Sequence, residues 1–144
     1  MRLGRLIRSF GLPMILLGLL AACGSTSFGV HDSFGLPGSI GGVCAAYFTI
    51  DNPTDQSDVL IGVSSDIAEA TEIHGIRTTN GLIEMYPLPQ VEIGTRQQVK
   101  FEPGGLHVMF VNLKRELKPG DAFPLTLHFR QRGSITTQVT VKEL

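Results

Sequence analysis

Short apolar runs separated by turn residues fill the chain from residue 41 onward. The runs are enriched in β-branched and aromatic residues and end at Gly, Pro, Asn or Asp, which is typical of β-strands. The pattern predicts strands over residues 44–51, 59–64, 70–77, 82–86, 98–101, 106–113, 123–130 and 134–141. Apart from a short turn expected near residues 66–70, helical periodicity is absent. Many short strands at regular spacing indicate an all-β sandwich or barrel.

The dipeptide Asn80-Gly81 is the strongest turn signal, because both of its residues tolerate the positive φ of a two-residue hairpin. Such a turn pairs Ile76 with Met85. Paired residues share a face of the sheet, and His74 shares that face with Ile76. The hairpin therefore predicts that His74 and Met85 are diagonal neighbours, about 7–8 Å apart at Cα.

A second His and Met lie on one predicted strand. His107 and Met109 are two positions apart, so they project from the same face. Leu106, Val108 and Phe110 project from the other face, where we expect the core. Each of these two segments thus offers one His and one Met on one face, and the sequence does not show whether the two faces meet.

These four side chains suit copper(I). His74, Met85, His107 and Met109 follow the spacing H-x10-M-x21-H-x-M. Thioethers select a soft monovalent ion, imidazole also suits copper, and both are neutral ligands. Unlike thiols, thioethers do not form disulfides in an oxidising compartment. The alternative is ordinary structural use, in which Met fills gaps in the core and His lies on the surface; the residues alone leave both readings open.

The first 22 residues have the pattern of an export signal. Three arginines precede a short apolar run, which ends in Leu-Ala-Ala before Cys23. This ending resembles the lipobox of bacterial lipoproteins, in which the signal is cut before Cys and the Cys is lipidated. The alternative is an ordinary secretory signal cut near Ala22, with Cys23 an idle thiol. We expect a signal peptide at 1–22, a lipidated Cys23 with a flexible tether over 23–40, and one β domain over 41–144.

Charge argues against nucleic acid as a partner. Charged residues make up 17% of the chain, and the net charge is −1. Removing residues 1–22 takes away three arginines and leaves nine basic against 13 acidic residues, a net charge of −4. A mildly acidic surface without a basic face does not favour nucleic acid, and it leaves the lipid as the means of membrane attachment. After removal of the signal, Met85 and Met109 are the only methionines.

At these four positions the chain resembles the PCuAC family of periplasmic copper chaperones, whose hallmark is H-x10-M-x21-H-x-M. The resemblance extends from about residue 42 to residue 141. It includes Cys-Ala-Ala-Tyr-Phe-Thr-Ile at 44–50, Pro-Gly-Gly-Leu-His-Val-Met at 103–109, and Leu-Lys-Pro-Gly-Asp at 117–121.

The resemblance implies a cupredoxin-like or immunoglobulin-like Greek-key β-sandwich or barrel. It implies one Cu(I) ion held by His74, Met85, His107 and Met109 near the surface, in the periplasm or at the cell surface. It also implies delivery to the CuA centre of cytochrome c oxidase subunit II, alone or with a Sco-type thiol chaperone. The Met- or His-rich tail of many relatives is missing from the end of this sequence, so a second ion or Cu(II) is not implied.

The other candidate residues favour structural roles. Cys44 is expected to be a small buried hydrophobe, with a copper ligand or reactive thiol as the alternative. His31 is expected to be a solvated tether residue, with a secondary metal contact as the alternative, and His128 a solvated surface histidine. The sequence contains no catalytic constellation, so we do not expect an enzyme. The alternatives to delivery are copper sequestration at the same site, or a metal-free docking module of the cell envelope.

Overall fold

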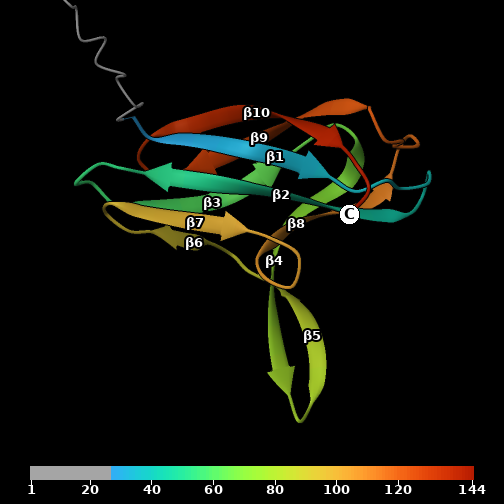
Figure 1. Ribbon diagram of the computed structural model, residues 1–144, viewed down its shortest axis with the longest axis horizontal. Coiled ribbons are helices and arrows are strands. Elements are labelled where there is room, and N and C mark those ends of the chain that lie inside the picture. The colour runs from blue at the N-terminus through green and yellow to red at the C-terminus, as the bar shows by residue number, and fades with distance from the viewer. Residues whose placement is uncertain (1–26) are drawn as a thin grey trace, which may run out of the picture.

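The computed structural model describes residues 27–144, which form ten strands and no helix, so none of these residues lies in a helix that could span a membrane. The strands are β1 (Gly29–Gly35), β2 (Val43–Asn52), β3 (Asp58–Ser64), β4 (Ala68–Thr79), β5 (Leu82–Pro87), β6 (Val91–Ile93), β7 (Gln97–Phe101), β8 (His107–Leu113), β9 (Ala122–Phe129) and β10 (Gly133–Val141). The sheet order is β5-β4-β8-β2-β1-β10-β9-β3-β6, with β7 paired to β2 (Figure 1).

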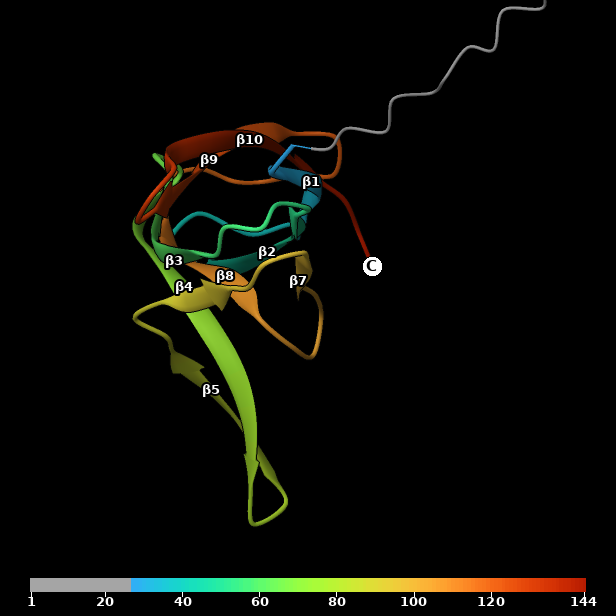
Figure 2. The ribbon, with the colours of Figure 1, turned by 90° about the vertical axis from the view of Figure 1, so that its left-hand side faces the viewer.

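The sheet folds over on itself around an apolar core. In Figure 2, β1, β9 and β10 lie above β2, β7 and β8. Phe110 of β8 and Phe123 of β9 meet edge to face between these layers, with ring centroids 5.3 Å apart. Both are fully buried, as are Leu125 and Leu127 of β9. The expected all-β class is confirmed, and the core lies on the face of β8 that carries Val108 and Phe110, as predicted.

All eight predicted strands are present, with ends shifted by at most two residues. Two further strands, β1 and β6, were not predicted. β1 corrects the expected tether over 23–40, because residues 29–35 pair with β2 on one side and β10 on the other. This strand could not be recognised from the sequence, because it contains the polar run His31-Asp32-Ser33. A bulge with φ 55° at Asp32 also breaks the alternation of apolar and polar residues along the strand. The predicted signal peptide and lipidated Cys23 lie outside the described residues.

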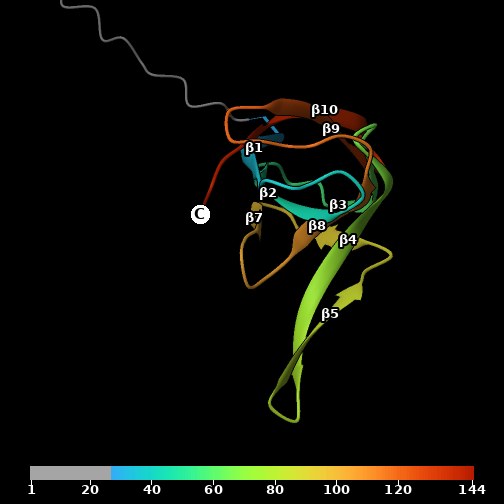
Figure 3. The same cartoon turned by 90° about the vertical axis from the view of Figure 1, so that its right-hand side faces the viewer.

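The β4–β5 hairpin projects from the body as an arm, visible in all three ribbon views (Figure 3). Asn80 and Gly81 have φ of 52° and 79°, as a two-residue primed turn requires. The predicted pairing of Ile76 with Met85 is confirmed. The side chain of Ile83, near the tip, is 72% exposed. The arm therefore carries its Met away from the core, while its root remains part of the sheet.

Candidate metal site

Direct pairing of β4 with β8 joins the two halves of the motif. His74 lies opposite His107, and Glu72 lies opposite Met109. On the other edge of β4, Ile76 lies opposite Met85. Because paired residues share a face, both histidines and both methionines are on the same face of the three strands. The sequence predicted each half, and the register of β4 and β8 supplies the connection between them.

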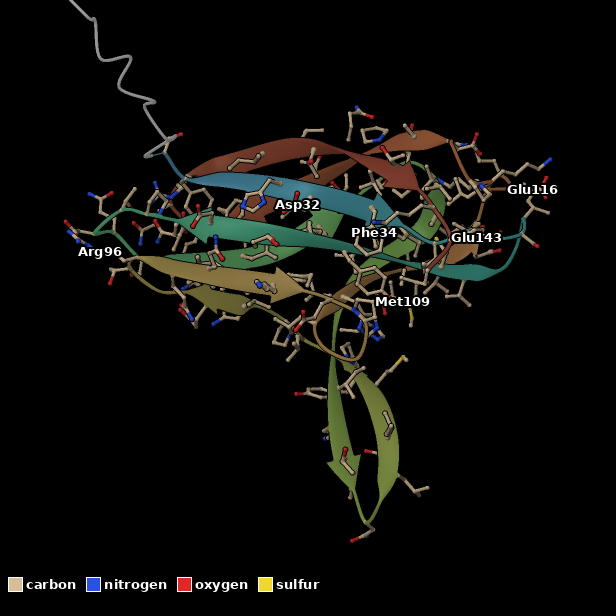
Figure 4. All side chains as sticks on the ribbon, viewed as in Figure 1. Asp32, Phe34, Arg96, Met109, Glu116 and Glu143 are labelled. Carbon is tan, nitrogen blue, oxygen red and sulfur yellow. The ribbon has the colours of Figure 1, made fainter. Side chains whose placement is uncertain are left out.

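Three of the four predicted residues line one cavity. Met85, His107 and Met109 border a hollow of about 220 Å³ at the root of the arm, where Figure 4 labels Met109. His74 is not part of this lining, but its ring centroid is 5.7 Å from that of His107. Exposure rises outward from 4% for His107 and 9% for His74 to 57% for Met85. The imidazoles are therefore the inner part of the site and Met85 the outer part.

Each imidazole has one occupied and one free nitrogen. Nε2 of His74 is 2.8 Å from Oε2 of Glu72, and Nδ1 of His107 is 3.0 Å from the carbonyl oxygen of Gly105. Both partners are acceptors, so in the neutral form of each ring the hydrogen lies on these nitrogens. Nδ1 of His74 and Nε2 of His107 are buried without a partner. Buried polar atoms are rarely left unpaired, and a lone pair on each is free to bind a metal.

Neighbouring elements leave room for an ion at this face. Met109 lies opposite Ala45 of β2, whose methyl group also lines the cavity. The β7–β8 turn brings Gly104 to the cavity wall with φ 82°, a backbone conformation that favours glycine. Tyr47 forms another part of the wall, and burial raises the pKa of its phenol. The cavity is thus bounded by a small side chain, a glycine turn and an aromatic ring.

Sequence reasoning missed Glu72. The spacing Glu72-x-His74 on a strand places both side chains on one face, and this signal was available in the sequence. Within residues 27–144, no three His, Cys, Asp or Glu side chains gather as a metal site would require.

The remaining candidate residues lie away from the cavity. Cys44 is 7% exposed on the core side of β2, paired with Phe110, and burial raises the pKa of its thiol to about 11. This fits the expected buried hydrophobe. His31 is exposed on β1 and bonded to Asp32 at 2.8 Å.

His128 corrects an expectation, because it is not a freely solvated surface residue. Its side chain is half-buried on β9. Nε2 bonds Ser64 of β3 at 2.8 Å, and Nδ1 bonds Ser134 of β10 at 2.9 Å. The ring therefore bridges three neighbouring strands, and both nitrogens are already used.

The sequence matches one known family and a curated relative. The LpqE-like family, described as proposed lipoproteins, matches residues 37–141. Lxx21020 of Leifsonia xyli subsp. xyli (strain CTCB07), named as a proposed lipoprotein, is 27% identical over 151 residues, covering 96% of this chain and 91% of Lxx21020. The family match begins at residue 37, close to the expected start of the β domain at residue 41.

Solved structures also resemble the domain, and two of them contain copper. The copper-bound PCuAC domain from PmoF2 has a TM-score of 0.66 at 22% identity, covering 82% of this chain and 97% of that domain. The Cu(I) form of DR1885 from Deinococcus radiodurans has a TM-score of 0.60 at 27% identity, covering 83% of each chain. The predicted PCuAC-type, cupredoxin-like β fold is therefore confirmed.

Proposed function

Because the chain belongs to the LpqE-like family and has the fold of PCuAC domains, we propose that it is an extracytoplasmic copper(I) carrier. In this proposal one Cu(I) ion binds to His74, Met85, His107 and Met109. Lipidation of Cys23 would tether the domain to a membrane, and the LpqE-like family match supports this anchoring. The copper that the related structures hold supports the choice of metal.

The observation that carries the proposal is the pair of buried, unpartnered nitrogens. Nδ1 of His74 and Nε2 of His107 have no hydrogen-bond partner on rings 5.7 Å apart. Two thioethers border the cavity beside His107. Neutral imidazole and thioether donors are the set that favours a soft monovalent ion over Zn(II) or a hard divalent cation.

The burial gradient suggests how the ion is handed over. Met85 is 57% exposed on the projecting arm, while both histidines are buried. An acceptor ligand would displace the Met85 thioether first, because that ligand is reached from solvent. The incoming thiolate forms a bond to Cu(I) as the thioether bond breaks, and copper keeps its oxidation state throughout. The histidines would release the ion last.

The binding test is a Cu(I) competition titration of the mature chain carrying Cys23→Ser, which removes the lipid. We expect one equivalent to bind. The double variant Met85→Ala/Met109→Ala should bind more weakly, because only the imidazoles remain. Leu82→Ala is the matched control, since Leu82 is 69% exposed on the same arm. An unchanged affinity in the double variant would contradict the proposed site.

Delivery is the further part of the proposal. We expect the acceptor to be the CuA centre of cytochrome c oxidase subunit II or a Sco-type thiol chaperone. Deleting the gene should lower oxidase activity in cells grown at low copper, and added copper should restore it. Normal oxidase activity in that strain, together with sensitivity to high copper, would replace delivery with sequestration at the same site.

A further inference from the structure

Glu72 is a carboxylate built into the face that carries the candidate ligands. It lies on β4, two residues before His74 and directly opposite Met109 on β8. Its Oε2 is 2.8 Å from Nε2 of His74, and 46% of its side chain is exposed. The carboxylate can therefore hold the ring from the solvent side while the opposite nitrogen stays buried.

The two histidines are held by different means. The backbone carbonyl of Gly105 accepts a hydrogen bond from Nδ1–H of His107, which leaves Nε2 free. The carboxylate of Glu72 accepts a hydrogen bond from Nε2–H of His74, which leaves Nδ1 free. A hydrogen bond at one ring nitrogen decides which nitrogen is left to bind a metal. The two cross-strand imidazoles thus offer opposite nitrogens.

We propose that Glu72 is a positioning residue that fixes the tautomer and orientation of His74, so that copper binds Nδ1 of His74 and Nε2 of His107. This inference rests on the proposed function. The carboxylate also contributes one negative charge beside four neutral ligands. That charge would offset the charge of a bound monovalent cation. The hydrogen bond also makes the other nitrogen of the His74 ring a more basic metal ligand.

The first test needs no copper. In the ¹⁵N-labelled mature chain carrying Cys23→Ser, long-range ¹H–¹⁵N spectra report which ring nitrogen of each neutral imidazole carries the proton. We expect Nε2–H for His74 and Nδ1–H for His107. Glu72→Ala should mix the tautomers of His74 and leave His107 unchanged. Glu72→Gln should keep Nε2–H, because its amide oxygen still accepts a hydrogen bond.

The second test measures Cu(I) affinity by competition. Loss of a group that orients a ligand typically lowers metal affinity by about 10- to 100-fold, and we expect this for Glu72→Ala. Glu72→Gln should recover most of the affinity. Glu69→Ala is the matched control, since Glu69 is an exposed carboxylate on the same strand. Glu69 is three residues before Glu72, so its side chain projects from the other face of β4.

The outcomes separate this inference from the proposed function. If the unaltered chain does not bind Cu(I), the proposed function fails, while the tautomer spectra still decide the role of Glu72. If the unaltered chain binds Cu(I) but Glu72→Ala leaves either the His74 tautomer or the affinity unchanged, the inference is overturned and the proposed function stands. The amide spectrum of each variant confirms that the domain is folded.

Discussion

His74 of β4 lies directly opposite His107 of β8, with ring centroids 5.7 Å apart and ring planes inclined at 53°. This relationship is fixed by backbone hydrogen bonds between two strands of the sheet. Sites built on strands hold their geometry better than sites built on loops. The two imidazoles are therefore held rigidly at the inner end of the site. The exposed thioether of Met85, on the projecting arm, is the side chain that can change its position most easily.

Filling the cavity should block the site without unfolding the domain. Ala45 lines the cavity opposite Met109 and is half-buried, so Ala45→Leu places a larger side chain where the ion would bind. We expect Cu(I) affinity to fall in a competition titration, while the urea midpoint changes little because the added atoms enter open space. Ala70→Leu is the control, on the same face beyond the site. Full Cu(I) affinity in Ala45→Leu would place the ion elsewhere.

The local geometry of the site could be predicted from the sequence. A His-x-Met pair on a strand shares a face, and Asn80-Gly81 fixed the register of the hairpin through its positive φ values. The pairing of β4 with β8 could not be predicted. It joins segments far apart in the chain, and a strand pattern shows which face is apolar but not which strand lies beside it.

Local patterns also failed where strands were short or interrupted. β6 has three residues, Val91–Ile93, too few for alternation to show. β1 contains a bulge at Asp32, so its polar residues read as a linker. Glu72 was overlooked for a different reason. Its spacing from His74 places both side chains on one face, but that spacing alone does not show that the carboxylate meets the ring nitrogen.

The turn of the arm should control copper binding more than global stability. Gly81 has φ 79°, where a β-branched side chain is strained by about 1–2 kcal/mol. Gly81→Val should therefore loosen the end of the arm, seen as faster amide hydrogen exchange at Arg77 and Glu84, which form a hydrogen-bonded pair of the hairpin, and should weaken Cu(I) binding through Met85. The control Asn80→Gly keeps a residue that tolerates positive φ. Unchanged amide protection in Gly81→Val would show that the turn is not needed to hold the arm.

Cys44 should be unreactive in the folded domain. The thiolate is the reactive form, and burial raises the pKa of Cys44 to about 11 from an ordinary value of 9.0. In the Cys23→Ser chain, Ellman's reagent at pH 8 should label Cys44 slowly when folded and rapidly in urea. Equal rates would contradict a buried thiol.

The same raised pKa links Cys44 to stability at high pH. Between pH 9.0 and about 11 the unfolded chain loses the thiol proton before the folded chain does. The free energy of unfolding should therefore fall as pH rises through this window. Below pH 9.0 the thiol is protonated in both states, and the stability is fully retained. Urea titrations at pH 8 and pH 10 measure the change, and Cys44→Ala should show a smaller one. An equal fall in that variant would assign the effect to other groups.

Asp58 should be one of the most sensitive polar positions of the fold, although it is not one of the proposed copper ligands. Its side chain is buried and accepts backbone N–H bonds from Val59, Gln131 and Arg132, at 2.7, 3.0 and 3.1 Å. Asp58→Ala leaves these donors without their acceptor, and we expect a loss of about 3 kcal/mol or more in a urea titration. Asp55→Ala, at an exposed ion pair, should have no measurable effect. Equal stability of the two variants would contradict this role, and the folded fraction of Asp58→Ala should still bind Cu(I).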